Sequence, residues 1–471
     1  MEHEPRLPPP GGRPAISRGV PEPAGTVPGG RLPRPGAAVV LAAGRSERLR
    51  PVTGGGSKSL VRLGGLALVE RAIRTLLGAG LKRIVVVVGY HAGPVATVAQ
   101  RLAPGRVRVV VAEGWEAGNA ASLAAAEPVL AEEPSFLLVS ADHLFGEGAL
   151  EELVAVGQPA VLVDPAPDEA VWEEATKVRV GTDGAVVALG KELTAPIVDC
   201  GAFLLTPAVF HSIRLARERG DATLSAAVTR MAESGRVVAV QLPPGAWWQD
   251  VDTPEDLARA RRLLRASLRR EGDGPVSRIL NRRLSIPISW ALAPLRPNPD
   301  VISVLAFAVG VAGAAFLAVG HGLLGGLLVQ ACSVLDGVDG EVARLTLRAG
   351  PRGTLLDGVL DRLSDAAVAG GLALWAVAAG EPPGAVVALA VAATTGAMLS
   401  MGSKDRIAAL GLAPPSERRL GWLLGGRDGR LALVAALGIA GLPLVALAAT
   451  AATSLVATAL RVAFARTFPP R

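Results

Sequence analysis

Four aspartates in the C-terminal half of the chain have the spacing of a metal site. Asp336 and Asp339 are three residues apart and Asp357 and Asp361 are four apart, so each pair shares one face of a helix. The segments on either side are almost wholly apolar. One ionised aspartate at the centre of a membrane helix costs about 2.5–3.5 kcal/mol, so four unpaired ones would cost about 10 kcal/mol. A divalent cation such as Mg²⁺ or Mn²⁺, which prefers oxygen ligands, would offset this cost.

The alternative is that these aspartates face water at helix ends and pair with nearby arginines, namely Arg344, Arg348 and Arg352. Small residues on the same helix faces favour a binding site instead, because they leave room for a bulky ligand. These small residues are Gly340, Ala343 and Gly353.

The whole pattern resembles the signature of the CDP-alcohol phosphotransferase family. It reads Asp336-x2-Asp339-Gly340-x2-Ala343-Arg344-x8-Gly353-x3-Asp357-x3-Asp361, without a departure at any fixed position. The resemblance implies that the four aspartates bind metal ions that hold a CDP-alcohol, and that Asp361 is also the general base for the acceptor hydroxyl. It further implies a cytidine nucleotide pocket lined by Gly340, Ala343, Arg344 and Gly353.

The N-terminal half alternates between buried-strand and helix patterns from residue 37 to residue 262. Strand patterns occur at 37–43, 83–88, 107–112 and 135–139, with helix patterns between them. This alternation predicts a doubly wound, mostly parallel α/β sheet with its ligand site at the carboxyl ends of the strands.

A glycine-rich basic loop follows the first predicted strand. It is neither a Walker A loop nor a dinucleotide-binding loop, because the glycine spacing of both is missing. From Leu41 to Lys58 it resembles the nucleotidyltransferase signature, with Ser46 and Ser57 at positions where that signature has glycine and proline. The resemblance implies that Arg48 and Lys58 clamp a nucleoside triphosphate and that Ala43 and Gly44 offer backbone N–H groups. The alternative is a basic surface loop.

Further matches to nucleotidyltransferases supply the rest of this site. Asn119 and Ser122 lie in a segment that resembles the part contacting base and ribose. Asp142, at a strand end, matches the metal-binding position of such enzymes, and Asp252 matches the second metal carboxylate, with Asp250 as the other candidate. Lys177 and Lys191 match the part that holds a sugar phosphate or polyol phosphate; the alternative for each is a solvated lysine.

Composition places the second half in a membrane. Of the 471 residues 50% are hydrophobic, the mean hydropathy is +0.40, and the excess lies after about residue 285. The net charge of +6 and the pI near 9.9 would suit nucleic acid, but the basic residues cluster in loops beside apolar segments, which predicts membrane orientation and no nucleic-acid partner. The two cysteines, Cys200 and Cys332, imply neither a disulfide framework nor a zinc site.

The sequence thus predicts a disordered tail without a secretory signal, a nucleotidyltransferase domain, a basic linker with an interfacial helix near 286–295, and an all-α polytopic membrane domain. The predicted bounds are 1–36, 37–262, 263–298 and 299–471. About six spans are expected, at 300–319, 322–341, 355–379, 383–402, 431–446 and 447–466.

Basic loops predict that both termini and both sites lie in the cytoplasm of a multi-pass cell-membrane protein. A basic loop could also hold an anionic acceptor, or could only orient the protein; it contains Lys404, Arg406 and Arg418.

The fusion of a CTP-using transferase to a CDP-alcohol-consuming domain suggests that the first makes the substrate of the second. The arrangement resembles bifunctional enzymes that convert CTP and inositol 1-phosphate into CDP-inositol and pyrophosphate. These enzymes then join CDP-inositol to a second inositol 1-phosphate, giving CMP and di-myo-inositol phosphate phosphate, a compatible-solute precursor. We therefore expect Mg²⁺ or Mn²⁺ at both sites, a lipid bilayer around the second domain, and room for a homodimer through it. The alternatives are a phospholipid-headgroup enzyme using CDP-diacylglycerol or another CDP-polyol, and a non-catalytic membrane anchor with a nucleotide-binding domain.

Overall fold

The computed structural model describes residues 31–467, except 46, 271, 413–421 and 423. The chain divides into two compact units, one comprising residues up to Ala260 except 64–66, and the other running from Arg261 onward together with residues 64–66. Most of the predicted disordered tail lies outside the described residues, so that expectation stays a prediction.

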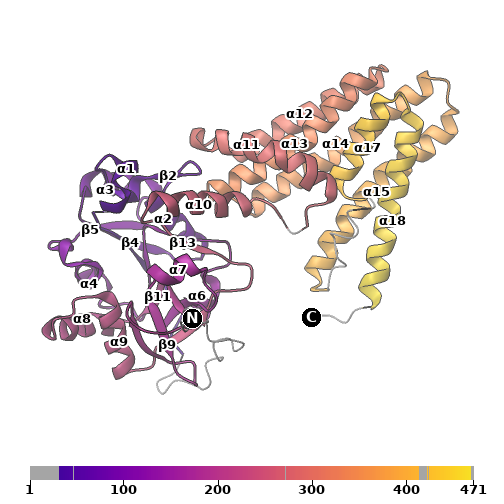
Figure 1. Cartoon of the computed structure of the whole chain (residues 1–471). Helices are drawn as coiled ribbons and strands as arrows, with labels where there is room; N and C mark the ends of the chain where they lie inside the picture. Colours follow the sequence, from indigo (N-terminus) through magenta and orange to yellow (C-terminus); the bar gives the residue numbers. More distant parts are fainter. Residues whose placement is uncertain (1–30, 46, 271, 413–421, 423, 468–471) are drawn as a thin grey trace, which may run out of the picture. The chain divides into compact units, whose positions relative to one another are not determined.

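The first unit, drawn in indigo to magenta in Figure 1, is built on a nine-stranded sheet. The strand order is β10-β9-β11-β6-β1-β4-β5, with β8 beside β11 and β12 beside β8. Strands β5, β4, β1 and β6 run parallel, with β5 at the edge of the sheet, whereas β11 joins β6 in the antiparallel sense. The strands are β1 (Ala37–Ala42), β4 (Arg83–Val88), β5 (Val107–Val111), β6 (Phe136–Ser140), β8 (Ala160–Asp164), β9 (Lys177–Val180), β10 (Val186–Gly190), β11 (Val198–Leu205) and β12 (Val238–Gln241).

Helices cover both faces of this sheet. Every residue of β1 is buried, which explains its unbroken apolar run: a parallel strand covered on both faces has no solvent side. One core packs the sheet against α2 (Leu68–Gly78) and α3 (Ala92–Leu102), and the other packs it against α4 (Asn119–Ala124), α8 (Ala208–Glu218) and α9 (Leu224–Ser234). The predicted doubly wound α/β fold is therefore confirmed, with antiparallel strands added at one edge.

A second, two-stranded sheet brings distant acidic residues together. β7 (His143–Phe145) pairs antiparallel with β13 (Trp248–Asp250), and His143 lies opposite Asp250 in the register. The N–H of Val251 donates to the Asp142 carbonyl oxygen at 3.1 Å. This small sheet fixes the segment around Asp250 beside the end of β6.

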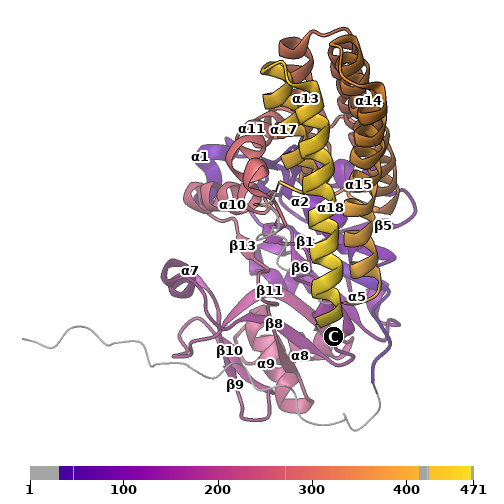
Figure 2. The ribbon, with the colours of Figure 1, turned by 90° about the vertical axis from the view of Figure 1, so that its right-hand side faces the viewer.

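The second unit is helical. Its main helices are α11 (Arg282–Leu292), α12 (Pro299–Ala318), α13 (Gly322–Leu345), α14 (Pro351–Ala378), α15 (Pro383–Ala409), α17 (Arg427–Ile439) and α18 (Pro443–Thr467). α12 packs on α13 and α14. α13 packs on α17, and α15 lies beside α18 (Figure 2). The helix predicted near 286–295 is present as α11; its place at a membrane interface stays a prediction.

Four helices in the described part of the chain are long and apolar enough to cross a membrane: α12, α13, α15 and α18. α14 carries Asp361, Arg362 and Asp365 in its middle, and α17 has only 13 residues. The membrane-type character of the domain is confirmed, but the count of six spans is not. The boundary between the last two predicted spans, expected at residues 446 and 447, lies earlier in the chain. α17 ends at Ile439, Gly441 has a φ of 77°, and Pro443 begins α18.

Close helix packing in this unit depends on small residues. A Cβ atom at Gly371 of α14 would lie 2.3 Å from the backbone oxygen of Ala314 on α12. A Cβ atom at the neighbouring Gly370 would meet nothing within 4 Å. Backbone approach of this kind is how helices associate where lipid removes the hydrophobic driving force.

We expect Gly371→Ala to lower the free energy of unfolding by about 1–3 kcal/mol, because the added methyl group overpacks the α12–α14 contact. Thermal unfolding in detergent measures this as a lower Tm. Gly370→Ala is the matched control and should be neutral or slightly stabilising, since alanine favours a helix by about 1 kcal/mol over glycine. Equal effects of the two substitutions would contradict the packing argument.

Candidate active sites

The first candidate site is centred on Lys58, whose ammonium group pairs with the carboxylates of Asp142 and Asp252. Lys58 begins a 3-10 turn, Lys58–Leu60, and the Ser57 hydroxyl caps this turn by accepting the N–H of Ser59 at 3.3 Å. The serine that replaces proline in the signature therefore has a local structural role. Arg48 pairs with Asp252 from the other side. Two cations and two carboxylates predicted from sequence thus meet in one cluster.

Sequence reasoning missed His143, which lies next to this cluster. Its Nδ1 is 2.9 Å from Asp142 Oδ1 and 3.8 Å from Asp250 Oδ1. The imidazole stacks on Trp248 with ring centroids 6.2 Å apart and an interplanar angle of 13°. Its position directly after a strand-end aspartate is the signal that could have identified it.

Burial and the opposite charges nearby have opposing effects on the pKa of each ionisable group in this cluster. Burial lowers the pKa of Lys58, but the neighbouring carboxylates, Asp142 first, outweigh it and raise the pKa above its usual value. Burial likewise lowers the pKa of His143, but Asp250 and Asp142 raise it to about 9. Burial raises the pKa of Asp250 to about 6 and that of Asp199 to about 7. The lysine is therefore held as a fixed cation.

Two cavities adjoin at this cluster. The first, about 400 Å³, is lined by most of the residues predicted for nucleotide and metal binding: Ala43, Gly44, Arg48, Lys58, Asn119, Asp142, Asp250 and Asp252. The second, about 760 Å³, shares Arg48, Asn119, His143, Asp250 and Asp252 with the first and adds Lys191, Asp199 and Gly201. The cavity expected to bind a nucleotide and the cavity expected to bind a polyol phosphate are therefore lined in part by the same charged residues.

Two predicted residues lie away from these cavities. The Ser122 hydroxyl is buried and donates to the Gly118 carbonyl oxygen at 3.2 Å. Lys177 is also buried; its Nζ donates to the Glu173 carbonyl oxygen and lies 4.7 Å from the ring centroid of Trp172. In this structure neither side chain lines either cavity.

The second candidate site gathers the signature aspartates of α13 and α14. Carboxylate oxygens of Asp336, Asp357 and Asp361 lie within 4.8 Å of one another. Asp339 accepts hydrogen bonds from the Ser303 hydroxyl and the Gly340 N–H, and its side chain also interacts with Asp357. The helical spacing seen in the sequence therefore does bring the four carboxylates together.

Arginines from α17, which sequence analysis left out of the site, balance part of the negative charge of this cluster. Arg427 Nη1 lies 2.8 Å from Asp336 Oδ2 and 2.9 Å from Asp361 Oδ1. Arg427 Nε is 3.3 Å from Asp365, which also pairs with Arg430 at 2.7 Å. No pattern local to residues 427–430 connects them to α14, so only the folded chain reveals this contact.

A buried glutamate fixes α13 from its opposite side. Glu341 has no exposed surface and accepts hydrogen bonds at 2.6 Å from Arg282 Nη1 and from the hydroxyls of Ser285 and Ser289, all on α11. Arg282 in turn forms two 2.9 Å hydrogen bonds with Asp273. This network ties α11 to the helix that carries Asp336 and Asp339.

The remaining predicted residues of this unit are placed as follows. Arg344 donates to the Leu268 carbonyl oxygen at 3.2 Å, and its Nη1 would lie 3.2 Å from a Cβ atom at Gly340. Gly353 faces Asp300, since a Cβ atom there would lie 3.7 Å from Oδ1. Ala343 is buried, Lys404 and Arg406 are exposed near the end of α15, and Arg418 lies outside the described residues.

Two family models match this chain. Residues 38–284 match the family model of the MobA-like NTP transferase domain, and residues 297–452 match that of CDP-alcohol phosphatidyltransferase. The chain is 40% identical to the "Bifunctional IPC transferase and DIPP synthase" of Rubrobacter xylanophilus over 88% of this chain and 93% of that protein. The chain belongs to this family.

Other similar proteins include a second relative of the same name and a solved structure. The protein of the same name from Archaeoglobus fulgidus is 34% identical over 70% of this chain and 64% of its own length. A solved structure described as the inositol-1-phosphate CTP transferase from T. maritima is 27% identical, covers 49% of this chain and 96% of its own, and has a TM-score of 0.45.

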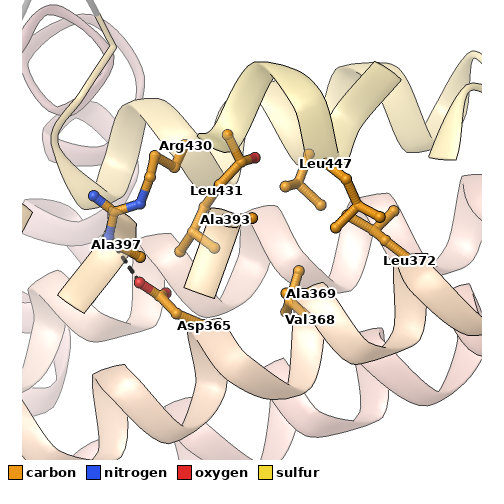
Figure 3. Close-up of a pocket in the computed structure, with 11 residues that line it drawn as sticks. Asp365, Val368, Ala369, Leu372, Ala393, Ala397, Arg430, Leu431 and Leu447 are labelled. Atoms are coloured by element: carbon orange, nitrogen blue, oxygen red, sulfur yellow. Dashed lines mark hydrogen bonds and ion pairs between the residues drawn. The ribbon is translucent and has the colours of Figure 1, made fainter. Parts of the chain in front are cut away.

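The second unit contains a small apolar cavity next to Asp365, between α14, α15, α17 and α18 (Figure 3). Val368, Ala369, Leu372, Leu431 and Leu447 line it, and the Asp365–Arg430 pair closes one end. Its volume of about 20 Å³ is that of about one water molecule. This cavity is too small for an acyl chain, so it gives no support to the phospholipid alternative.

Replacing Glu341 should destabilise the second unit. Glu341→Leu leaves Arg282 Nη1 and two serine hydroxyls without their buried acceptor, which costs about 1–3 kcal/mol for each unsatisfied group. We expect a lower Tm in detergent together with weaker phosphotransfer, because α13 loses its support. Glu341→Gln, which keeps one acceptor oxygen, should lose less, and a Leu variant as stable as the wild type would contradict the role of this network.

Proposed function

We propose that the chain transfers CMP from CTP to inositol 1-phosphate, giving CDP-inositol and pyrophosphate. The second unit then transfers phosphoinositol from CDP-inositol to a second inositol 1-phosphate, giving di-myo-inositol phosphate phosphate and CMP. The observation that carries this proposal is the presence of two separate carboxylate clusters, each held by its own fixed cations, in a chain whose relatives are named for two activities.

In the first step, a phosphate oxygen of inositol 1-phosphate attacks the α-phosphorus of CTP, and pyrophosphate leaves. Lys58 and Arg48 line the smaller cavity and supply positive charge against the negative charge that develops on the phosphates. The pairing of Lys58 with Asp142 and Asp252 fixes its ammonium group before substrate binds. Catalysis here consists mainly of positioning and charge neutralisation.

The larger cavity suits the polyol phosphate. Lys191 can pair with its phosphate, and Asp199 can accept hydrogen bonds from its hydroxyl groups. Asn119 lines both cavities and is placed to contact the nucleotide. We assign CTP to the smaller cavity and inositol 1-phosphate to the larger one.

The residues of both sites fit divalent cations. Three carboxylate groups converge in the second unit, and in the first unit Asp250 Oδ1 is a buried oxygen without a hydrogen-bond partner among the described residues. Asp142 with Asp252 or Asp250 would hold the ion of the first site, and Asp336, Asp339, Asp357 and Asp361 would hold those of the second. Such ions neutralise phosphate charge and polarise phosphoryl oxygens.

In the second step, Asp361 removes the proton from a hydroxyl of the second inositol 1-phosphate. That oxygen attacks the β-phosphorus of CDP-inositol, a phosphodiester forms, and CMP leaves. Arg427 orients the carboxylates of Asp336 and Asp361 through its ion pairs with both. Gly340, Ala343, Arg344 and Gly353 would line the nucleotide pocket.

Several finer assignments belong to the same proposal. Lys404, Arg406 and Arg418 would attract the phosphate of the acceptor. The second unit would span the cell membrane with both sites on the cytoplasmic side, so that the intermediate stays in one compartment, and it could form a homodimer.

Phosphorus NMR of detergent-purified protein with CTP, Mg²⁺ and inositol 1-phosphate tests the two steps. We expect CDP-inositol and pyrophosphate first, then CMP and a phosphodiester. Activation of a different polyol phosphate, or consumption of supplied CDP-diacylglycerol instead, would show that inositol is the wrong substrate.

Substitutions should separate the two activities. Lys58→Met should slow CDP-inositol formation by about 10²–10³-fold, the scale for losing one charge-stabilising group, while supplied CDP-inositol is still converted. Asp361→Asn should slow the second step by about 10²–10⁴-fold, so that CDP-inositol accumulates. If one substitution abolished both steps with the protein folded, the assignment of one activity to each unit would be wrong.

A further inference from the structure

We propose that His143 is a nitrogen ligand of a divalent first-row transition-metal ion, which it holds through Nδ1 together with Asp142 and Asp250. The ligands form a mixed set of one imidazole and two carboxylates in the first unit. This inference rests on the proposed function, because the metal site lies in the cavity assigned to CTP. Metal binding can nevertheless be measured without CTP.

The three donor atoms have the mutual distances of ligands to one ion. His143 Nδ1 is 2.9 Å from Asp142 Oδ1 and 3.8 Å from Asp250 Oδ1, and each of the three residues offers one ligand atom within 4.8 Å of the other two. Neighbouring ligands about 2.1 Å from an ion are about 3.0–3.4 Å apart in octahedral or tetrahedral geometry. Small side-chain adjustments therefore suffice for all three to bind one ion.

A second observation points to a ligand. Asp250 Oδ1 is inaccessible to solvent and has no hydrogen-bond partner in the part of the chain that the structure describes. A buried carboxylate oxygen without a partner is costly. Asp142 divides its oxygens, since Oδ2 pairs with Lys58 and Oδ1 faces His143. A cation bound at the Oδ1 side would satisfy Asp250 without displacing Lys58.

The fold holds the imidazole in the orientation that this role requires. Gly201 has φ of 76°, and a Cβ atom there would lie 2.2 Å from Cδ2 and 2.4 Å from Nε2 of His143. Trp248 stacks on the ring face, and Asp199 interacts electrostatically with the imidazole. The edge with Nε2 is therefore packed against Gly201 while Nδ1 faces the carboxylates, as a preorganised ligand requires.

The competing explanation is that His143 only forms ion pairs with both aspartates. As an ion-pair partner, Nδ1 would donate its one proton to Asp142, 2.9 Å away; metal binding through Nδ1 would release that proton. The 3.8 Å separation from Asp250 is too long for a hydrogen bond, so the histidine alone does not satisfy that oxygen. An imidazole ligand also favours Mn²⁺, Fe²⁺, Co²⁺ or Zn²⁺ over Mg²⁺, which prefers oxygen ligands only.

Pulsed EPR of Mn²⁺ bound to the full chain, tag-free in detergent and without CTP, tests the proposal. We expect ¹⁴N coupling from one imidazole, changed to a ¹⁵N pattern by ¹⁵N-histidine labelling of the unaltered protein. Mn²⁺ at the four-aspartate site gives no such coupling from its carboxylates. His143→Gln should remove the coupling and weaken one class of Mn²⁺ sites by about tenfold or more.

His211→Gln, at an exposed position of α8, is the matched control and should keep both the coupling and the affinity. The labelling measurement does not depend on any variant folding, and Tm values check that His143→Gln is folded. Absence of nitrogen coupling in the wild type, or its persistence in His143→Gln, would overturn the proposal. If CDP-inositol formation continued in that case, the proposed function would stand without a nitrogen ligand.

Discussion

The structure depends on cations that are built into the chain and held against partly buried carboxylates. In the first unit Lys58 joins Asp142 to Asp252, two residues more than 100 positions apart in sequence. In the second, Arg427 joins Asp336 on α13 to Asp361 on α14. A carboxylate removed from water without a partner is strongly unfavourable, so these pairs let the chain fold around the carboxylates to which the proposed function assigns metal binding. They also hold each carboxylate in a fixed orientation.

Both clusters are supported by structure behind them. In the first unit the short β7–β13 pairing sets His143 opposite Asp250, and Gly201 makes room for the imidazole. In the second unit Glu341 receives three hydrogen bonds from α11 and so fixes the helix that carries Asp336 and Asp339. Functional carboxylates act at defined distances, so their supporting contacts matter as much as their own charge.

Much of this was predictable because the informative patterns are local. Alternating strand and helix patterns predicted the sheet, and spacings of three and four residues predicted that Asp336, Asp339, Asp357 and Asp361 would share one cluster. His143, Arg427 and Glu341 were not predicted, because each acts through contacts that cross between distant elements. Lys177 was predicted as a phosphate ligand, but it lines neither cavity. Its ammonium group donates to the backbone carbonyl oxygen of Glu173 and lies over the ring of Trp172. The prediction of six spans depended on hydropathy alone. Two of the six helices do not qualify as spans, because α14 carries charged residues and α17 is only 13 residues long.

The two clusters differ in how much positive charge the protein itself supplies. In the first, Lys58 and Arg48 face Asp142, Asp250 and Asp252, and His143 lies against two of these carboxylates. In the second, the ion pairs found among the described residues to the signature aspartates and Asp365 come from Arg427 and Arg430, and Arg270 interacts electrostatically with Asp357. The second cluster therefore needs more external positive charge, and in a low-dielectric setting that need is stronger. This difference fits the proposed chemistry: the first site would need little positive charge beyond the ion proposed at His143, whereas the second would hold its cations while CDP-inositol and its acceptor meet there.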